Sequence, residues 1–235
     1  MPTMRHGQLV LVGALLFGFA THGEARILVG RQCAINKLVT LAGGVDGILR
    51  CQADAASAGV AADPACIQTA ADRVTSRFVT LDQRLGTECW AYGTESLAGP
   101  DVQMLATSLA GMLRPTLDAS SCAAAKLRAV GKAVKKQAKL RAYGGGTLSE
   151  FSTTITKLTN KFIASEAKPD CITNGDAVTV SDATTETTRI LYLRIFFGTC
   201  GDDVVPYGWP VPHEDCDGSD DAVCPGLCSA TCTCP

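Results

Sequence analysis

Histidine is scarce in this chain of 235 residues: it occurs three times, and only His213 lies beyond residue 25. A nucleophile activated by histidine, as in serine and cysteine hydrolases, would depend on this single side chain. The sequence also lacks a Cys-x-x-Cys-His haem motif and a phosphate-binding glycine loop that ends in lysine. We therefore expect no catalytic activity. A carboxylate-dependent hydrolase stays open as an alternative, because paired carboxylates are recognised only in three dimensions.

Only one long apolar run is present, at residues 9–20. Arg5 precedes it, and Gly23 and Ala25 follow it as small residues at positions −3 and −1 of a cleavage site. This layout predicts a secretory signal peptide over residues 1–25. No later run approaches the roughly 18 residues of a membrane-spanning helix, so we expect no membrane span after signal removal. The sequence thus predicts a secreted, periplasmic or cell-surface protein.

Cysteine, in contrast, is plentiful: the chain has 12, and all of them follow residue 32. Exported chains meet an oxidising environment, in which an even number of cysteines forms disulfides by default. Half of these cysteines lie in the body of the chain and half in residues 200–235. We therefore expect a disulfide-stabilised body and a short disulfide-rich tail.

The body contains a weak internal repeat. Cys33-Ala-Ile-Asn-Lys-Leu opens one copy, and Cys122-Ala-Ala-Ala-Lys-Leu opens the other. In each copy an amphipathic segment follows and ends near a second cysteine, Cys89 or Cys171. We predict a mainly α fold of two tandem three-helix units with disulfides, followed by a small irregular tail: residues 26–118, 119–199 and 200–235.

The second segment of each copy has the clearest helix pattern. Its apolar residues recur every three or four positions and so lie on one helix face: Ile67, Ala70, Val74, Phe78, Leu81 and Leu85 in one copy, and Phe151, Ile155, Leu158 and Phe162 in the other. Asp63-Pro64 supplies an N-cap and a proline at the first helical position. Thr147 and Glu150 match a capping box, and Gly86 is typical of a helix end.

The remaining segments are less regular. We expect one helix at residues 100–113, beginning at Pro100, and another at about 177–197. The latter is rich in valine and threonine, so a strand stays open as an alternative. The first helix of the first copy contains three glycines, each costing about 1 kcal/mol relative to alanine. We expect them to admit a neighbouring backbone: Gly43, Gly44 and Gly47.

An antiparallel arrangement of the first two helices of each copy predicts the disulfides of the body. The start of one helix then lies beside the end of the next, which pairs Cys33 with Cys89 and Cys122 with Cys171. At a rise of about 1.5 Å per residue, the two helices of the first copy match in length. Their opposite ends therefore bring Cys51 to Cys66.

Charge is distributed unevenly along the chain. Residues 26–199 contain 20 Lys and Arg against 15 Asp and Glu, whereas residues 200–235 contain seven acids and no Lys or Arg. The densest basic segment has no acid within it: Lys126, Arg128, Lys132, Lys135, Lys136, Lys139 and Arg141. Three interpretations stay open.

The first is a solvated helix face, and the second is pairing with the acidic tail. The third is a surface for an outside polyanion, such as an envelope polymer, formed by five lysines: Lys126, Lys132, Lys135, Lys136 and Lys139. Aromatic side chains do not interleave with these charges, so we expect no specific nucleic-acid partner.

The tail contains Cys200-Gly-Asp, Glu214-Asp-Cys216-Asp and Cys224-x3-Cys228, and then Cys232 and Cys234. This pattern resembles the extracellular Cys-rich repeat of myxobacterial and related surface proteins, except at residues 204–213. The resemblance implies an extracellular location and disulfides, with fifteen pairings open for six cysteines. The body resembles uncharacterised exported Ala/Lys/Cys-rich helical proteins of environmental bacteria, which implies no activity.

The tail also clusters four carboxylates, at Asp215, Asp217, Asp220 and Asp221. Clustered oxygens suit calcium, although the full 12-residue calcium loop with its closing glutamate is absent. Zinc on the tail cysteines is disfavoured by their spacing and by an oxidising compartment. We expect no cofactor, with calcium as the alternative.

Taken together, these features favour a secreted or envelope-exposed structural or interaction protein without catalytic activity. Its partner is not specified by the sequence, and an envelope polymer or a surface protein is the class we expect. A binding module for calcium or for an anionic surface polymer is the alternative, and the carboxylate-dependent hydrolase is the third.

Overall fold

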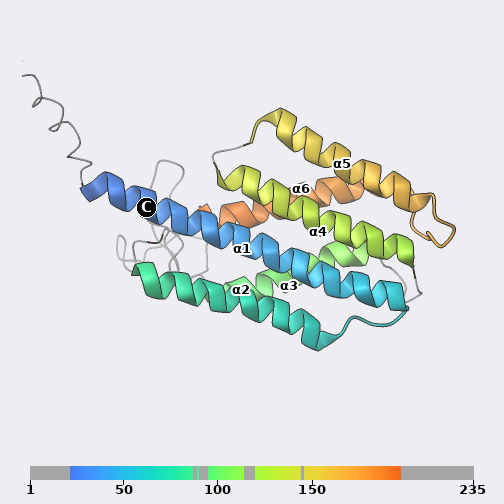
Figure 1. The fold of residues 1–235 in the computed structure, drawn as a ribbon, viewed down its shortest axis with the longest axis horizontal. Helices are drawn as coiled ribbons and strands as arrows, with labels where there is room; N and C mark the ends of the chain where they lie inside the picture. Colours follow the sequence, from blue (N-terminus) through green and yellow to red (C-terminus); the bar gives the residue numbers. More distant parts are fainter. Residues whose placement is uncertain (1–21, 87–88, 90–94, 114–119, 144–145, 197–235) are drawn as a thin grey trace, which may run out of the picture.

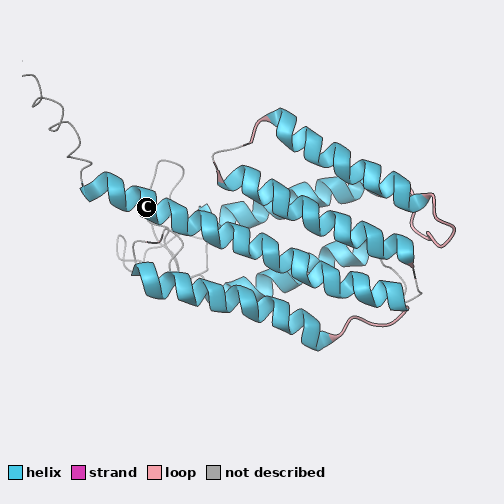
Figure 2. Ribbon diagram, in the orientation of Figure 1, coloured by secondary structure: helices cyan, strands magenta, loops and turns pink. Residues whose placement is uncertain are grey.

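The computed structural model describes residues 22–86, 89, 95–113, 120–143 and 146–196. These residues form helices and connecting turns and contain no β-strand (Figure 2). The predicted tail, its aspartates and its six cysteines lie outside the described residues, as does most of the predicted signal peptide. The helices, in chain order, are α1 (His22–Ala58), α2 (Pro64–Leu85), α3 (Glu95–Leu113), α4 (Ser121–Ala142), α5 (Leu148–Glu166) and α6 (Ala177–Phe196). The prediction of a mainly α fold with disulfides is confirmed.

The helices lie in two layers (Figure 1). In the front layer α2, α1, α4 and α5 lie side by side, and α3 and α6 cover them from behind. α1 and α4 share the most extensive helix contact, so the two predicted units meet along their first helices. One continuous hydrophobic cluster contains residues of all six helices, among them Leu38, Phe78, Val102, Leu127, Phe162 and Leu191.

The predicted helix signals fold as expected. The Asp63 side chain accepts a hydrogen bond from the backbone N–H of Ala65, and Pro64 is the first residue of α2. Gly86 ends α2 with a positive φ of 54°, a conformation that glycine adopts without a Cβ penalty. Thr147 and Glu150 form the complete capping box of α5.

Two boundaries differ from the prediction. α1 begins at His22, well before the motif at Cys33. α3 begins at Glu95, so Pro100 lies inside it. A proline at this position removes one intrahelical hydrogen bond, and Ala98 and Gly99 hold the preceding turn in the buried interior.

The prediction of a helix at about 177–197 is confirmed, and the alternative of a strand is not, because this segment forms α6. Three of its threonines, Thr184, Thr187 and Thr188, are buried. Thr184 Oγ1 donates to the Val180 carbonyl at 2.6 Å, and Thr188 Oγ1 donates to Gln137 Oε1 of α4 at 2.8 Å. Packing and hydrogen bonds therefore override the β propensity of this composition.

The three predicted disulfides of the body are present. Cys33 pairs with Cys89, Cys51 with Cys66 and Cys122 with Cys171, with Cα–Cα distances of 5.3, 6.0 and 5.1 Å. They join α1 to the segment after α2, α1 to the start of α2, and the start of α4 to the segment after α5. The antiparallel pairing of the helices is thus fixed covalently.

Gly44 and Gly47 admit close contacts in the centre of the molecule, but with side chains of neighbouring helices and not with the backbone that was expected. A Cβ on Gly44 would collide with Val74 of α2, and one on Gly47 would lie 3.3 Å from the Cβ of Ala70. Gly43, in contrast, has open space around it. In α4, Gly131 is similarly placed against α1, where Asp46 lies.

Candidate functional site: a lysine-lined groove between α4 and α5

The basic segment predicted from the sequence forms most of α4, and the helix distributes its charges over different faces. Lys126 is fully buried. Its Nζ donates to Glu166 Oε1 and Asp176 Oδ1, both at 2.8 Å, and to the Thr173 carbonyl at 2.6 Å. Lys126 therefore does not belong to a surface that an outside polyanion reaches, and its inclusion in that predicted surface was wrong.

Other members of the basic segment have partners within the fold. Lys135 Nζ lies 3.3 Å from Asp46 Oδ2 of α1, a buried carboxylate that also accepts from Arg50. Arg128 pairs with Asp54 at 2.7 Å. Lys139 is exposed.

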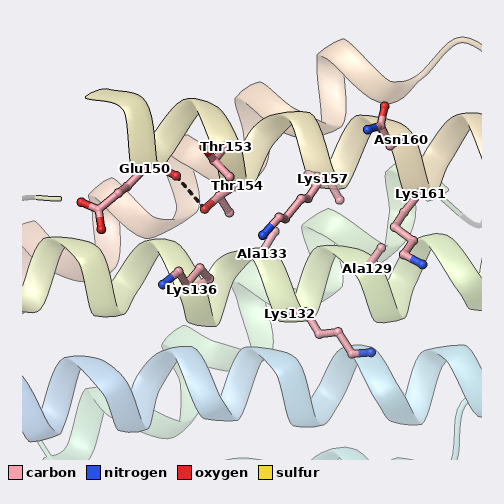
Figure 3. Close-up of a pocket in the computed structure, with 11 residues that line it drawn as sticks. Ala129, Lys132, Ala133, Lys136, Glu150, Thr153, Thr154, Lys157, Asn160 and Lys161 are labelled. Carbon is pink, nitrogen blue, oxygen red and sulfur yellow. Dashed lines mark hydrogen bonds between the residues drawn. The ribbon is translucent and has the colours of Figure 1, made fainter. Parts of the chain in front are cut away.

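Lys132 and Lys136 lie one helical turn apart, both are exposed, and both line a groove between α4 and α5. Here the two helices leave a groove of about 580 Å³ between them. Two lysines of α5, Lys157 and Lys161, line the same groove and point toward α4, whereas the ammonium group of Lys132 points toward α1 (Figure 3). Four lysines from two helices thus contribute to the lining. The structure thus joins two predicted lysines to two that the sequence analysis missed.

The groove has a narrow apolar floor and a polar rim. Ala129, Ala133 and Leu158 lie at its base, where small side chains on α4 leave room between the helices. Thr153, Thr154 and Asn160 of α5 complete its lining together with Glu150.

The carboxylate of Glu150, at one end of the groove, accepts hydrogen bonds from the backbone N–H and the hydroxyl of Thr147 at 2.9 and 3.2 Å. Glu150 is thus already engaged by the cap of α5. Within the described part of the chain, none of the four groove lysines forms an ion pair. Unneutralised ammonium groups that share one groove attract anions.

A second basic surface has a different form. Arg73 and Arg77 of α2 lie beside Asp72 in a shallow depression that a single helix lines. Among the described residues, no second helix forms a wall opposite these arginines. Arg73 and Arg77 therefore provide exposed positive charges outside the groove, which suit a control variant.

Each half of the fold also buries one lysine beside a disulfide. Lys37, four residues after Cys33, contacts Asp82 at 2.6 Å, and its Nζ lies 4.9 Å from the centre of the Phe78 ring. Lys126, four residues after Cys122, pairs with Glu166, and its Nζ lies 5.0 Å from the centre of the Phe162 ring. The two halves thus repeat one buried arrangement of a lysine, an acid and a phenylalanine.

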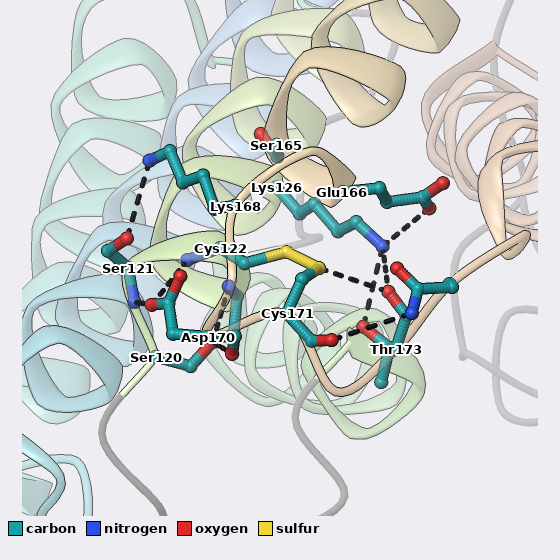
Figure 4. Close-up of a disulfide and its surroundings, with 12 residues drawn as sticks. Ser120, Ser121, Cys122, Lys126, Ser165, Glu166, Lys168, Asp170, Cys171 and Thr173 are labelled. Atoms are coloured by element: carbon teal, nitrogen blue, oxygen red, sulfur yellow. Dashed lines mark hydrogen bonds and ion pairs between the residues drawn. A yellow bond between two sulfur atoms is a disulfide. The ribbon is translucent and has the colours of Figure 1, made fainter.

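The second of these arrangements adjoins the Cys122–Cys171 disulfide (Figure 4). The hydrogen bond from Lys126 is the main cause of a lowered pKa for the Glu166 carboxyl. Nearby, the backbone N–H groups of Ser121 and Cys122, at the start of α4, donate to the Asp170 carboxylate. The pKa of Asp170 is lowered, chiefly by its hydrogen bond with the Ser121 side chain.

These acids suit a structural role. Glu166 and Asp176 lie close together, but both bind Lys126, so neither faces the groove as a free acid or base. Cys33, Asp82 and Cys89 also cluster, but the two sulfurs are joined in a disulfide and do not offer thiolates to a metal. No helix in the described ranges is long and apolar enough to cross a membrane.

Comparison of this chain with family models, with curated proteins and with solved structures found no match.

Proposed function

We propose that this protein is exported and binds an anionic polymer, without catalysing a reaction, in the groove between α4 and α5. The observation that carries the proposal is that Lys132, Lys136, Lys157 and Lys161, from two helices, all line one groove. Lysines from two helices that line one cavity differ from the scattered charges of an ordinary solvated face. The groove therefore supports a binding function over the interpretation of α4 as merely solvated.

The chemistry of the groove fits reversible association. Lysine side chains carry an ammonium group with three N–H donors and a positive charge at neutral pH. Because the four groups lie on an exposed rim, they attract a polyanion at modest desolvation cost, and salt screens that attraction. Binding should therefore weaken as ionic strength rises.

The cellular location is supported by separate features. Three disulfides in the described residues are typical of an oxidising compartment. The charge and apolar pattern of residues 1–25 matches a signal peptide. An exported protein meets anionic envelope polymers, which makes such a polymer the partner that we propose.

Retention of the full-length protein on immobilised heparin, used as a model polyanion, tests the proposal. We expect retention at about 0.15 M salt and loss of it when the four groove lysines are changed to glutamine. The matched control removes four exposed charges from α1 and α2: Arg31→Gln, Arg73→Gln, Arg77→Gln and Arg84→Gln.

Both variants lose four positive charges. A difference in their heparin retention would therefore show that the groove binds heparin specifically. Equal elution of the two variants would assign the effect to net charge and contradict the proposal. Failure of the wild type to be retained would contradict it as well. Circular dichroism of both variants checks that the helical fold is intact.

A further inference from the structure

We infer that the polymer which the groove takes is an acidic polysaccharide, with carboxylate or sulfate groups recurring along a hydroxyl-rich chain. This inference rests on the proposed function. It adds the chemical class of the ligand, which follows from how the lining residues are distributed.

The positive charges extend along the whole groove. Lys136 lies near the Glu150 end, Lys161 lies at the opposite end, and Lys132 and Lys157 lie between them (Figure 3). Lysines four residues apart on one wall are separated by about 6 Å along the helix axis. A ligand with a single anionic head group would leave most of these ammonium groups unpaired. A chain with anionic groups repeated along its length engages all four.

Two neutral hydrogen-bonding residues, Thr153 and Asn160, also line the groove on its α5 side. The Asn160 side chain is exposed at the outer edge of α5, where its amide points away from α4 (Figure 3), and it forms no hydrogen bond within the described residues. Its amide therefore offers two N–H donors and one acceptor to a chain that extends over this edge. The Thr153 hydroxyl donates to the Ser149 carbonyl at 2.8 Å and keeps lone pairs that accept. Donors and acceptors of this kind match the hydroxyl groups of sugars.

The lining also lacks the groups that favour other polyanions. Among the described residues that line the groove there is no aromatic side chain and no arginine. Proteins bind single-stranded nucleic acids by stacking bases on aromatic rings, and arginine often binds phosphate through two parallel hydrogen bonds from its guanidinium group. Lysine instead provides compact point charges, and the apolar floor at Ala129, Ala133 and Leu158 suits the C–H face of a saturated ring.

Titration of the full-length protein with defined polymers tests the inference. The probes are polygalacturonate as the uronic acid polymer, oligo-deoxythymidine of equal charge, neutral dextran, and vesicles containing phosphatidylglycerol. At about 0.15 M salt, we expect polygalacturonate to bind roughly tenfold or more tightly than the oligonucleotide, with no binding of dextran.

A paired substitution separates sugar recognition from charge. Thr153→Ala with Asn160→Ala should weaken polygalacturonate binding roughly threefold to tenfold, the effect of one or two lost hydrogen bonds, and leave oligonucleotide binding unchanged. Replacing the four lysines by glutamine should abolish both.

Each other outcome is decisive. Equal or tighter binding of the oligonucleotide or the vesicles overturns the polysaccharide inference and leaves the proposed polyanion function standing. No effect of the paired substitution also overturns the inference. If no polyanion binds at all, the proposed function itself fails.

Discussion

The ammonium group of Lys126 is enclosed by two carboxylates and a carbonyl oxygen, and its side chain has no exposed surface. Replacing it by methionine keeps much of the volume but leaves Glu166 and Asp176 facing each other without a cation. We expect Lys126→Met to lower the free energy of unfolding by roughly 2 to 4 kcal/mol, because unpaired charges at a largely buried position are costly.

Urea unfolding measures this change, and Lys132→Met is the matched control in the same helix. Lys132 is exposed and has no ion-pair partner in the described residues, so its substitution should alter stability by less than about 0.5 kcal/mol. Equal changes in the free energy of unfolding for the two variants would show that the buried ion pairs of Lys126 do not stabilise the fold.

Glu166 makes the same arrangement sensitive to acid. Its pKa is held below the ordinary value of 4.5, mainly by the hydrogen bond from Lys126. A carboxyl with a lowered folded pKa stabilises the fold while it is ionised. That contribution is lost as pH falls through the folded value. Wild-type stability should therefore decline more steeply below about pH 5 than that of Glu166→Gln.

Urea titrations at a series of acid pH values check this expectation. Burial raises the pKa of Asp101 despite the adjacent Arg194, so that residue acts in the opposite direction. Comparing wild type with Glu166→Gln removes this shared contribution. Parallel stability curves for the two proteins would refute the account of Glu166.

A helical period also explains why sequence reasoning misplaced Lys126. The residue lies four positions before Val130 and eight before Val134, on the buried stripe of α4. Lys132 and Lys136 lie off that stripe and reach the surface, as the sequence analysis expected for the whole segment. The sequence analysis treated all the basic residues of this segment as one surface. The helical spacing of Lys126 with Val130 and Val134 would have placed Lys126 on the buried face instead.

At the scale of helices, α1 and α4 approach closely at Gly131. A Cβ there would lie 2.5 Å from Asp46 Oδ1 and 3.1 Å from the Asp46 Cα, which the backbone holds in place. We expect Gly131→Ala to destabilise the protein by about 1 to 3 kcal/mol, as overpacking does in a tight interior.

Gly111 of α3 provides the contrast, because a Cβ at that position meets nothing within 4 Å. There the ordinary helix preference for alanine should prevail, and Gly111→Ala should raise stability by up to about 1 kcal/mol. Thermal unfolding of both variants measures whether each substitution lowers or raises the stability of the protein. Stabilisation by Gly131→Ala would show that the two helices are not in close contact.

The whole molecule combines features that the sequence predicts with others that it does not. Local signals such as the capping box at Thr147 predicted helix starts, and matched helix lengths predicted the Cys51–Cys66 disulfide. The shared core of α1 and α4 depends on long-range packing, for example of Asp46 against Gly131. The groove likewise depends on how α5 lies beside α4, which the charges of α4 alone do not specify.

Charge at the scale of the chain gives a further expectation. Residues 200–235 carry seven acids and no Lys or Arg, so they can compete with an outside polyanion for the groove lysines. Replacing the seven acids by their amides in the full-length protein should therefore strengthen heparin binding at low salt. This gain should shrink at about 1 M salt, where the Debye length is about 3 Å. Unchanged affinity at low salt would exclude such competition.

The most direct test of the central claim, that the groove holds a polyanion, is lysine footprinting. The rate at which each lysine is acetylated is measured by mass spectrometry, with and without heparin. The account predicts that heparin slows acetylation of Lys132, Lys136, Lys157 and Lys161 together. The exposed Lys139 and Lys168, which do not line the groove, should keep their rates. Protection of Lys139 and Lys168 equal to that of the groove lysines, or no protection in the groove, would contradict the account.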